Sequence, residues 1–189
     1  MKQKSKLIIM NLWVLYLGGY VIAYAIQEWA NRRRGEPFDD SEFMYQKRVF
    51  IPALAWIFGG FILSIFVPIV LGYLFFFGLV IAIIGMAIGI LALYSFANNP
   101  GLTTTRIHHY SRNPIYVGWT IFFLGLTLIG WSGSIWSVLF LMYFLYTIGY
   151  LHWTVLQEEG FLIGKYGAPY KEYMENTPRY LGRLRKSQE

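Results

Sequence analysis

The residues of this chain that could do chemistry gather in two short polar segments, residues 98–116 and 158–179. The first is dense in hydrogen-bond donors and aromatic rings, and the second opens with two adjacent carboxylates. Long stretches elsewhere lack such groups, because no Asp, Glu, Lys or Arg occurs from residue 49 to 105 or from 113 to 157. We therefore expect polar chemistry where these two segments face each other.

Arg112 is the candidate anion-binding residue of the first segment. Pro114 suits the first turn of a helix, since its φ is fixed and its missing N–H costs nothing there. Arg112 and Asn113 would then lie at a helix N-terminus, where free N–H groups favour an anion and the guanidinium adds a planar fork for a carboxylate or phosphate. A simpler interpretation is that Arg112 faces the phosphates of membrane lipids.

Glu158 and Glu159 open the second segment, and a carboxylate pair there could bind a ribose, an amine or a cation. The same pair could equally be a solvated helix end. Glu159 and His109 are the candidates for accepting a proton from an amine. Although His108 is adjacent to His109, we predict no metal site, because His152 is the only other histidine and cysteine is absent.

Three tyrosines of the second segment, Tyr166, Tyr170 and Tyr173, recur at i, i+4 and i+7, a spacing that predicts one shared helical face. One interpretation is an amphipathic helix that lies on the membrane. Another is an aromatic wall over a bound cation, because aromatic rings attract sulfonium and quaternary ammonium groups.

The elements that must position these residues are membrane helices. The chain is 56% hydrophobic and 14% charged, whereas soluble domains are roughly a quarter charged. Two very short joints predict antiparallel hairpins of the second and third spans and of the fourth and fifth. Gly85 and Gly89 predict close helix packing. Five apolar segments approach the roughly 20 residues of a span: residues 7–26, 49–70, 73–97, 115–131 and 135–155.

We therefore predict an all-α protein with five transmembrane helices and a short cytosolic C-terminal helical segment. Residues 2–26 have the basic start of a signal peptide, but the apolar run is long and we expect it to remain as a span. If the N-terminus is outside and the C-terminus inside, thirteen of the sixteen Lys and Arg residues lie on the cytoplasmic side, as the positive-inside rule favours. This orientation places both polar segments in the cytoplasm.

The order of these motifs resembles the isoprenylcysteine carboxyl methyltransferase and phospholipid methyltransferase family of integral membrane enzymes. The resemblance covers about residues 98–180. It is carried by Ser111-Arg112-Asn113-Pro114-Ile115-Tyr116-Val117-Gly118 and, after a helical hairpin, by Glu158-Glu159, Leu162, Tyr166-Gly167, Tyr170, Tyr173 and Pro178-Arg179.

The resemblance implies methyl transfer from S-adenosyl-L-methionine, with S-adenosyl-L-homocysteine as product, in a cytosol-facing pocket that the C-terminal segment closes. Residues 1–97 would form a scaffold. Residues 98–189 would form the cofactor-binding half, made of a loop (98–114), a hairpin (115–157) and the C-terminal segment (158–189). The implied cofactor contacts are Pro100, Gly101, Leu102, Thr103, His108, Asn113, Pro114, Ile115, Tyr116 and Glu158.

Two positions depart from the isoprenylcysteine enzymes, which have a tyrosine where this chain has His108 and a substrate-linked arginine where it has Thr154. Either Arg112 or Arg106 replaces that arginine, or the substrate is not a prenylcysteine. We assign the catalytic roles to Arg112, for a substrate carboxylate, and to Glu159, for the proton of an amine.

The leading functional hypothesis is methylation of the carboxylate of a lipidated or isoprenoid substrate, which needs no general base because a carboxylate is ionised at pH 7. Methylation of a phospholipid amine is the alternative. A scaffold or small transporter is less expected, because the span interiors lack ionisable groups apart from His152. We expect the partners to be a lipid-like or prenylated substrate and the membrane, and we expect neither nucleic acid nor metal.

Overall fold

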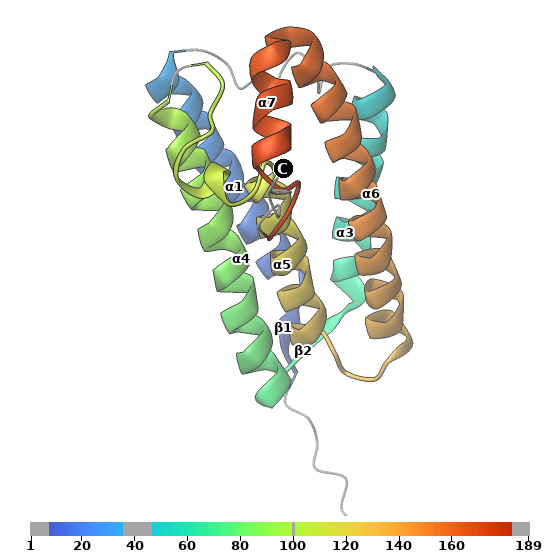
Figure 1. Cartoon of the computed structure of the whole chain (residues 1–189). Coiled ribbons are helices and arrows are strands. Elements are labelled where there is room, and N and C mark those ends of the chain that lie inside the picture. The colour runs from blue at the N-terminus through green and yellow to red at the C-terminus, as the bar shows by residue number, and fades with distance from the viewer. Residues whose placement is uncertain (1–7, 36–46, 100, 183–189) are drawn as a thin grey trace, which may run out of the picture.

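The computed structural model describes residues 8–35, 47–99 and 101–182, and this part of the chain is mostly helical. Figure 1 shows the helices running side by side, with α5 between α4 and α6. A two-stranded antiparallel sheet joins β1 (Ile8–Asn11) to β2 (Pro68–Val70) at one end of the bundle. The helices are α1 (Trp13–Arg34), α3 (Lys47–Phe66), α4 (Tyr73–Ala97), α5 (Pro114–Ile129), α6 (Ile135–Tyr166) and α7 (Ala168–Asn176), with a 3-10 turn η1 (Arg106–His109) before α5.

Three of these helices, α3, α4 and α6, are long and apolar enough to cross a membrane. Helix α5 is also apolar but has only 16 residues, and α1 ends in three arginines. The predicted class, a helical integral membrane protein, is therefore confirmed. The count of five spans and the orientation stay predictions.

The first predicted span is displaced along the chain. Residues 8–11 form β1 rather than helix, because they pair with β2 and because the N–H of Leu12 donates to the carbonyl of Val67 at 2.9 Å. Helix α1 then continues eight residues beyond the predicted end at residue 26, until Gly35 adopts a φ of 74° and ends it. Its last turn consequently reaches the loop that follows α4.

The predicted hairpin of the second and third spans is wrong. Helix α3 packs against α6 and α1, whereas α4 packs against α5 and α1. The connection at residues 67–72 is used by β2, which pairs with β1 and carries the chain across the bundle (Figure 1). Because α5 and α6 do contact each other, the predicted hairpin of the fourth and fifth spans is confirmed.

Helices α4 and α5 approach each other closely through glycines. A Cβ added at Gly85 would collide with the backbone nitrogen of Phe122 and lie 2.7 Å from the carbonyl oxygen of Gly118. A Cβ at Gly118 would in turn lie 2.7 Å from the carbonyl oxygen of Gly85. Helix packing at Gly85, as predicted from its spacing to Gly89, is thus part of the fold.

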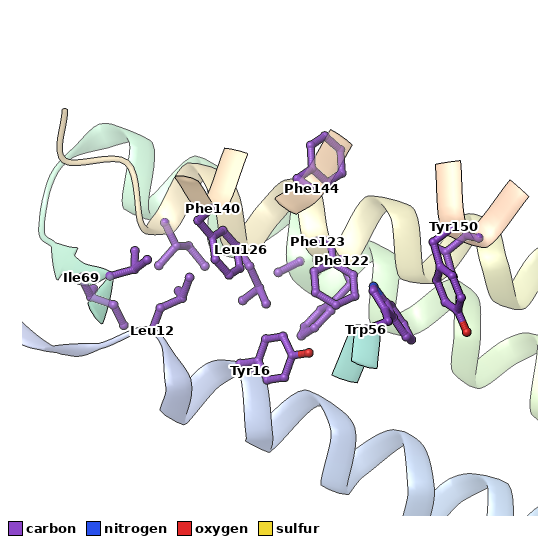
Figure 2. Packing of buried hydrophobic residues seen from close by; sticks show 14 of the residues in the cluster. Leu12, Tyr16, Trp56, Ile69, Phe122, Phe123, Leu126, Phe140, Phe144 and Tyr150 are labelled. Atoms are coloured by element: carbon purple, nitrogen blue, oxygen red, sulfur yellow. The ribbon is translucent and has the colours of Figure 1, made fainter. Parts of the chain in front are cut away.

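An aromatic cluster fills the interior between α1, α3, α5 and α6. Figure 2 shows Tyr16, Trp56, Phe123 and Tyr150 pointing into one cluster from these helices. The polar atoms buried with the rings have partners, since the Tyr16 hydroxyl donates to the carbonyl of Ile57 at 2.8 Å. This cluster fixes the spacing of the helices whose ends carry the polar segments.

Candidate active site

The two polar segments meet at the end of the bundle opposite the β-sheet. Residues 98–113 connect α4 to α5, and α6 extends past the predicted end at Val155 to Tyr166, so that it carries Glu158 and Glu159 as regular helix. Gly167, with a φ of 62°, then turns the chain back into α7. Figure 1 shows α7 beside α6 and directed toward the start of α5.

The three tyrosines do not share one helical face, so that prediction is wrong. The break at Gly167 leaves Tyr166 on α6 and places Tyr170 and Tyr173 on α7, where both are buried. The Tyr173 hydroxyl donates to the carbonyl of His108 at 2.6 Å, which fastens α7 to the η1 turn. Burial raises the pKa of Tyr170 and Tyr173, so both stay protonated at neutral pH.

Glu159 lies between two arginines at the centre of this region. Its Oε1 is 3.0 Å from Nη2 of Arg112, and its Oε2 is 2.8 Å from Nη2 of Arg179. Asn113 adds a hydrogen bond from Nδ2 to Oε1 at 3.3 Å. The Glu159 residue is only 3% exposed, so this carboxylate is buried and both of its oxygens are already bound.

All three guanidinium nitrogens of Arg112 donate to acceptors in the protein. Nε and Nη2 donate to Glu159, while Nη1 donates to the carbonyls of Met174 at 2.6 Å and Thr177 at 2.9 Å. The backbone N–H of Arg112 also donates to the carbonyl of Pro178 at 2.9 Å. Arg112 therefore joins the start of α5 to α6 and to the segment after α7.

Glu158 has a different environment from its neighbour. Its Oε2 accepts a hydrogen bond of 2.6 Å from the Tyr116 hydroxyl, and its side chain lines two adjoining cavities. We call the first the loop cavity; it measures about 70 Å³ and is lined by Gly101, Leu102 and Thr103 of the α4–α5 loop and by Tyr170 and Tyr173.

The second, which we call the aromatic cavity, measures about 210 Å³ and runs between α3, α5 and α6. Its walls include Trp56, Trp119 and Tyr150. Thr154, the position at which the resemblance expects an arginine, also lines it. The two cavities share His108, Arg112 and Glu158 as common wall.

His108 is buried at this common wall. Its Nδ1 has no hydrogen-bond partner among the described residues. Burial lowers the pKa of His108 from 6.5 to about 4, so the imidazole is neutral at pH 7. A buried polar atom without a partner is uncommon in native proteins, and here it marks a position where a ligand can supply the missing hydrogen bond.

The predicted cofactor residues fall along both cavities. Of these residues, Pro100 lies outside the part of the chain that the structure describes. Those that line the loop cavity are Gly101, Leu102, Thr103, His108 and Glu158. Those that line the aromatic cavity are Asn113, Pro114, Ile115 and Tyr116, together with His108 and Glu158.

The other two histidines lie apart from these cavities. His109 is exposed and packs edge-on against Tyr110, and Nδ1 of His152 lies 2.6 Å from the Tyr180 hydroxyl. Within residues 8–35, 47–99 and 101–182, no three His, Cys, Asp or Glu side chains are grouped so that they could hold a metal ion.

The site also includes residues that were not among those predicted, and these include Arg179, Trp56, Trp119 and Tyr150. Arg179 belongs to the C-terminal motif, and the rule that a buried carboxylate needs cationic partners could have paired it with Glu159. The three aromatic residues come from different helices. No local sequence pattern reports which faces of those helices meet.

The fold and the site define a helical integral membrane protein with a polar site at one end of its bundle. A family model described as phospholipid methyltransferase matches residues 67–169, from β2 to the first turn of α7. This match covers more than half of the chain, and the chain belongs to that family, which confirms the resemblance. It is therefore a membrane methyltransferase. No curated protein and no solved structure matches the chain.

Proposed function

We propose that this protein transfers a methyl group from S-adenosylmethionine to the amine head group of a membrane lipid, at a site on the cytoplasmic side. The observation that carries the choice of acceptor is the aromatic cavity, which combines Trp56, Trp119 and Tyr150 with the carboxylate of Glu158. Aromatic faces and a carboxylate both attract a cationic head group. The family and the apolar helices support a lipid acceptor.

The loop cavity suits S-adenosylmethionine, which when bound supplies an electrophilic methyl group. Glu158 provides a negative charge and Tyr170 and Tyr173 provide aromatic faces for a sulfonium. The neutral imidazole of His108 does not repel that cation and can hydrogen-bond to a ligand. At about 70 Å³ the cavity is smaller than the roughly 300–1,000 Å³ typical of ligand pockets, so we expect α7 and residues 101–103 to separate on binding.

A carboxylate acceptor, the leading hypothesis from sequence, has weaker support at this site. The cation that lines the aromatic cavity, Arg112, already donates from all three guanidinium nitrogens to Glu159, Met174 and Thr177. Thr154 is buried and its hydroxyl donates to the carbonyl of Tyr150. Arg106 interacts with the Tyr94 ring rather than with either cavity. A substrate carboxylate would therefore have to displace an existing ion pair.

The chain contributes position and environment to an amine reaction. An ammonium head group must lose a proton before its nitrogen can attack, and the carboxylate of Glu158 in the wall of the aromatic cavity would accept that proton. Glu158 lines the aromatic cavity, whereas Glu159 is bound at both oxygens by Arg112 and Arg179. Alignment in such a site can supply on the order of 7–11 kcal/mol of the barrier.

The test uses the purified full chain in vesicles that contain phosphatidylethanolamine, supplied with methyl-labelled S-adenosylmethionine. We expect label in the lipid fraction, and we expect this label to resist mild base. An N-methyl group is stable under these conditions, whereas a methyl ester is hydrolysed and releases methanol. Glu158→Gln should lower the rate about tenfold or more. The control is Glu28→Gln, which removes a carboxylate from the surface ion pair with Arg32 and should leave the rate unchanged. Base-labile label would instead establish a carboxylate acceptor, and no transfer to any lipid would refute the proposal.

A further inference from the structure

The C-terminal end of α1 is bonded to the loop that lines the loop cavity. Nη2 of Arg34 donates to the carbonyl oxygen of Gly101 at 2.7 Å. The guanidinium carbon of Arg34 also lies 3.9 Å from the centre of the Phe96 ring, a close cation–π contact. Both Phe96 and Gly101 line the loop cavity. Arg34 thus touches two of its walls from a helix that is not itself part of that cavity.

Two more side chains of α1 contact the same region. Nε of Arg33 donates to Oδ1 of Asn98 at 3.2 Å. The Trp29 ring stacks on the Tyr94 ring, with 6.2 Å between centres and 8° between planes. We call Trp29, Arg33 and Arg34 the α1 clasp, because they bind the last turn of α4 and the start of the following loop.

Gly101 is bonded to a residue outside its own loop. Its φ of 70° is in the left-handed region, which is readily available to glycine and costly for other residues. The neighbouring loop residues are bonded to the end of α4, as when Nδ2 of Asn99 donates to the carbonyl of Ser95 at 2.6 Å. Gly101 itself is fixed by the charge-assisted bond from Arg34, which is stronger than a neutral one.

We propose that the α1 clasp positions residues 101–103 for cofactor binding, with Arg34 as its main positioning residue. The proposal rests on the proposed function, because it assigns the loop cavity to S-adenosylmethionine. Helix α1 lies outside residues 67–169, the part that matches the family. The cofactor site of this chain therefore includes a contribution from the half that the sequence assigned to scaffold alone.

The test measures binding of S-adenosylhomocysteine to the purified full chain by calorimetry. Arg34→Ala removes both contacts, and Arg34→Lys keeps the charge but not the planar fork. Arg32→Ala is the matched control, since Arg32 lies in the same helical turn, has a side chain 78% exposed and pairs with Glu28 of its own helix. We expect Kd to rise about tenfold in Arg34→Ala and about threefold in Arg34→Lys, and to stay within about twofold in Arg32→Ala.

A purely structural role would lower stability without changing affinity in the folded protein. To distinguish a structural from a positioning role, each variant is also assayed for kcat and KM. We expect KM for S-adenosylmethionine to rise and KM for the lipid to stay constant. Wild-type affinity in a folded Arg34→Ala protein would overturn it, as would an equal loss in Arg32→Ala. If Arg34→Ala does not fold, wild-type affinity in Arg34→Lys overturns it. If the wild-type chain itself binds no S-adenosylhomocysteine, it is the proposed function that fails.

Discussion

Arg112 and Glu159 form a buried ion pair, with Nη2 3.0 Å from Oε1 and side chains only 7% and 5% exposed. The pair joins the start of α5 to the end of α6, and Arg179 binds the other carboxylate oxygen. Removing one member of a buried pair leaves an uncompensated charge and typically costs about 3–5 kcal/mol. Glu159 is therefore expected to act chiefly on stability, although the sequence predicted a catalytic role for it.

Glu159→Gln should lower the free energy of unfolding by about 3 kcal/mol, because Arg112 and Arg179 lose their shared anion. Glu158→Gln should have a smaller effect, of about 1 kcal/mol, since glutamine keeps an oxygen that accepts the hydrogen bond from the Tyr116 hydroxyl. Denaturant unfolding in detergent micelles measures both. A Glu159→Gln protein with wild-type stability and no turnover would restore Glu159 as the proton acceptor.

Tyr116→Phe should reduce kcat/KM about tenfold and leave the fold intact. The Tyr116 hydroxyl donates to Glu158 at 2.6 Å, and the variant removes this bond from the wall that the two cavities share. Steady-state kinetics with labelled cofactor measure the effect. The control is Tyr110→Phe, at a residue 67% exposed, where we expect no change. Equal rates for both variants would show that the bond to Glu158 has no part in turnover.

Gly85→Ala should destabilise the protein by about 2 kcal/mol or more, and Gly89→Ala should have little effect. A Cβ at Gly85 meets the backbone of α5 at Phe122 and Gly118, which cannot rotate away. A Cβ at Gly89 has no heavy atom within 4 Å. Thermal unfolding of the two variants measures the difference. Similar unfolding temperatures would contradict this description of the α4–α5 contact.

Hydropathy located the helices of this fold well but not their ends. The predicted third span, residues 73–97, coincides with α4, because its apolar run begins directly after Gly72 and ends at the polar pair Asn98-Asn99. Helix α6 instead runs 11 residues past the predicted end, through Gly160 and Gly164, and ends where Gly167 takes a φ of 62°. A hydropathy pattern reports where lipid surrounds a helix, and a helix in water continues until its backbone is interrupted.

The site was predictable where it rests on local motifs and not where it rests on packing. Glu158 and the loop residues 101–103 fall beside one cavity, as the order of the motifs implied. The pairing of Glu159 with Arg179 and the contact of Arg34 with Gly101 depend on how helices distant in sequence are placed. The misplaced hairpin of α3 and α4 has the same origin, because a short joint does not reveal the β1–β2 pairing that separates them.

The proposed orientation predicts which introduced cysteines an impermeant maleimide labels in intact cells. The chain has no native cysteine, so Glu172→Cys on α7 and Ser132→Cys between α5 and α6 each present a single thiol. We expect labelling at Ser132→Cys alone, because the positive-inside rule places α7 in the cytoplasm. Both should react after the membrane is permeabilised. Labelling of Glu172→Cys in intact cells would place the site on the outer side.

His108 should make the stability of the protein depend on pH in a mildly acidic window. Burial lowers its pKa from 6.5 to about 4, so between these values the unfolded chain binds a proton that the folded chain excludes. Stability from this residue is complete above pH 6.5 and is lost as pH falls to 4, to a total of about 3 kcal/mol. His108→Gln should flatten the pH dependence of the unfolding temperature. The control is His109→Gln, at the exposed neighbour, which should retain the pH dependence. Identical profiles for His108→Gln and wild type would show that the buried imidazole is not the group that titrates.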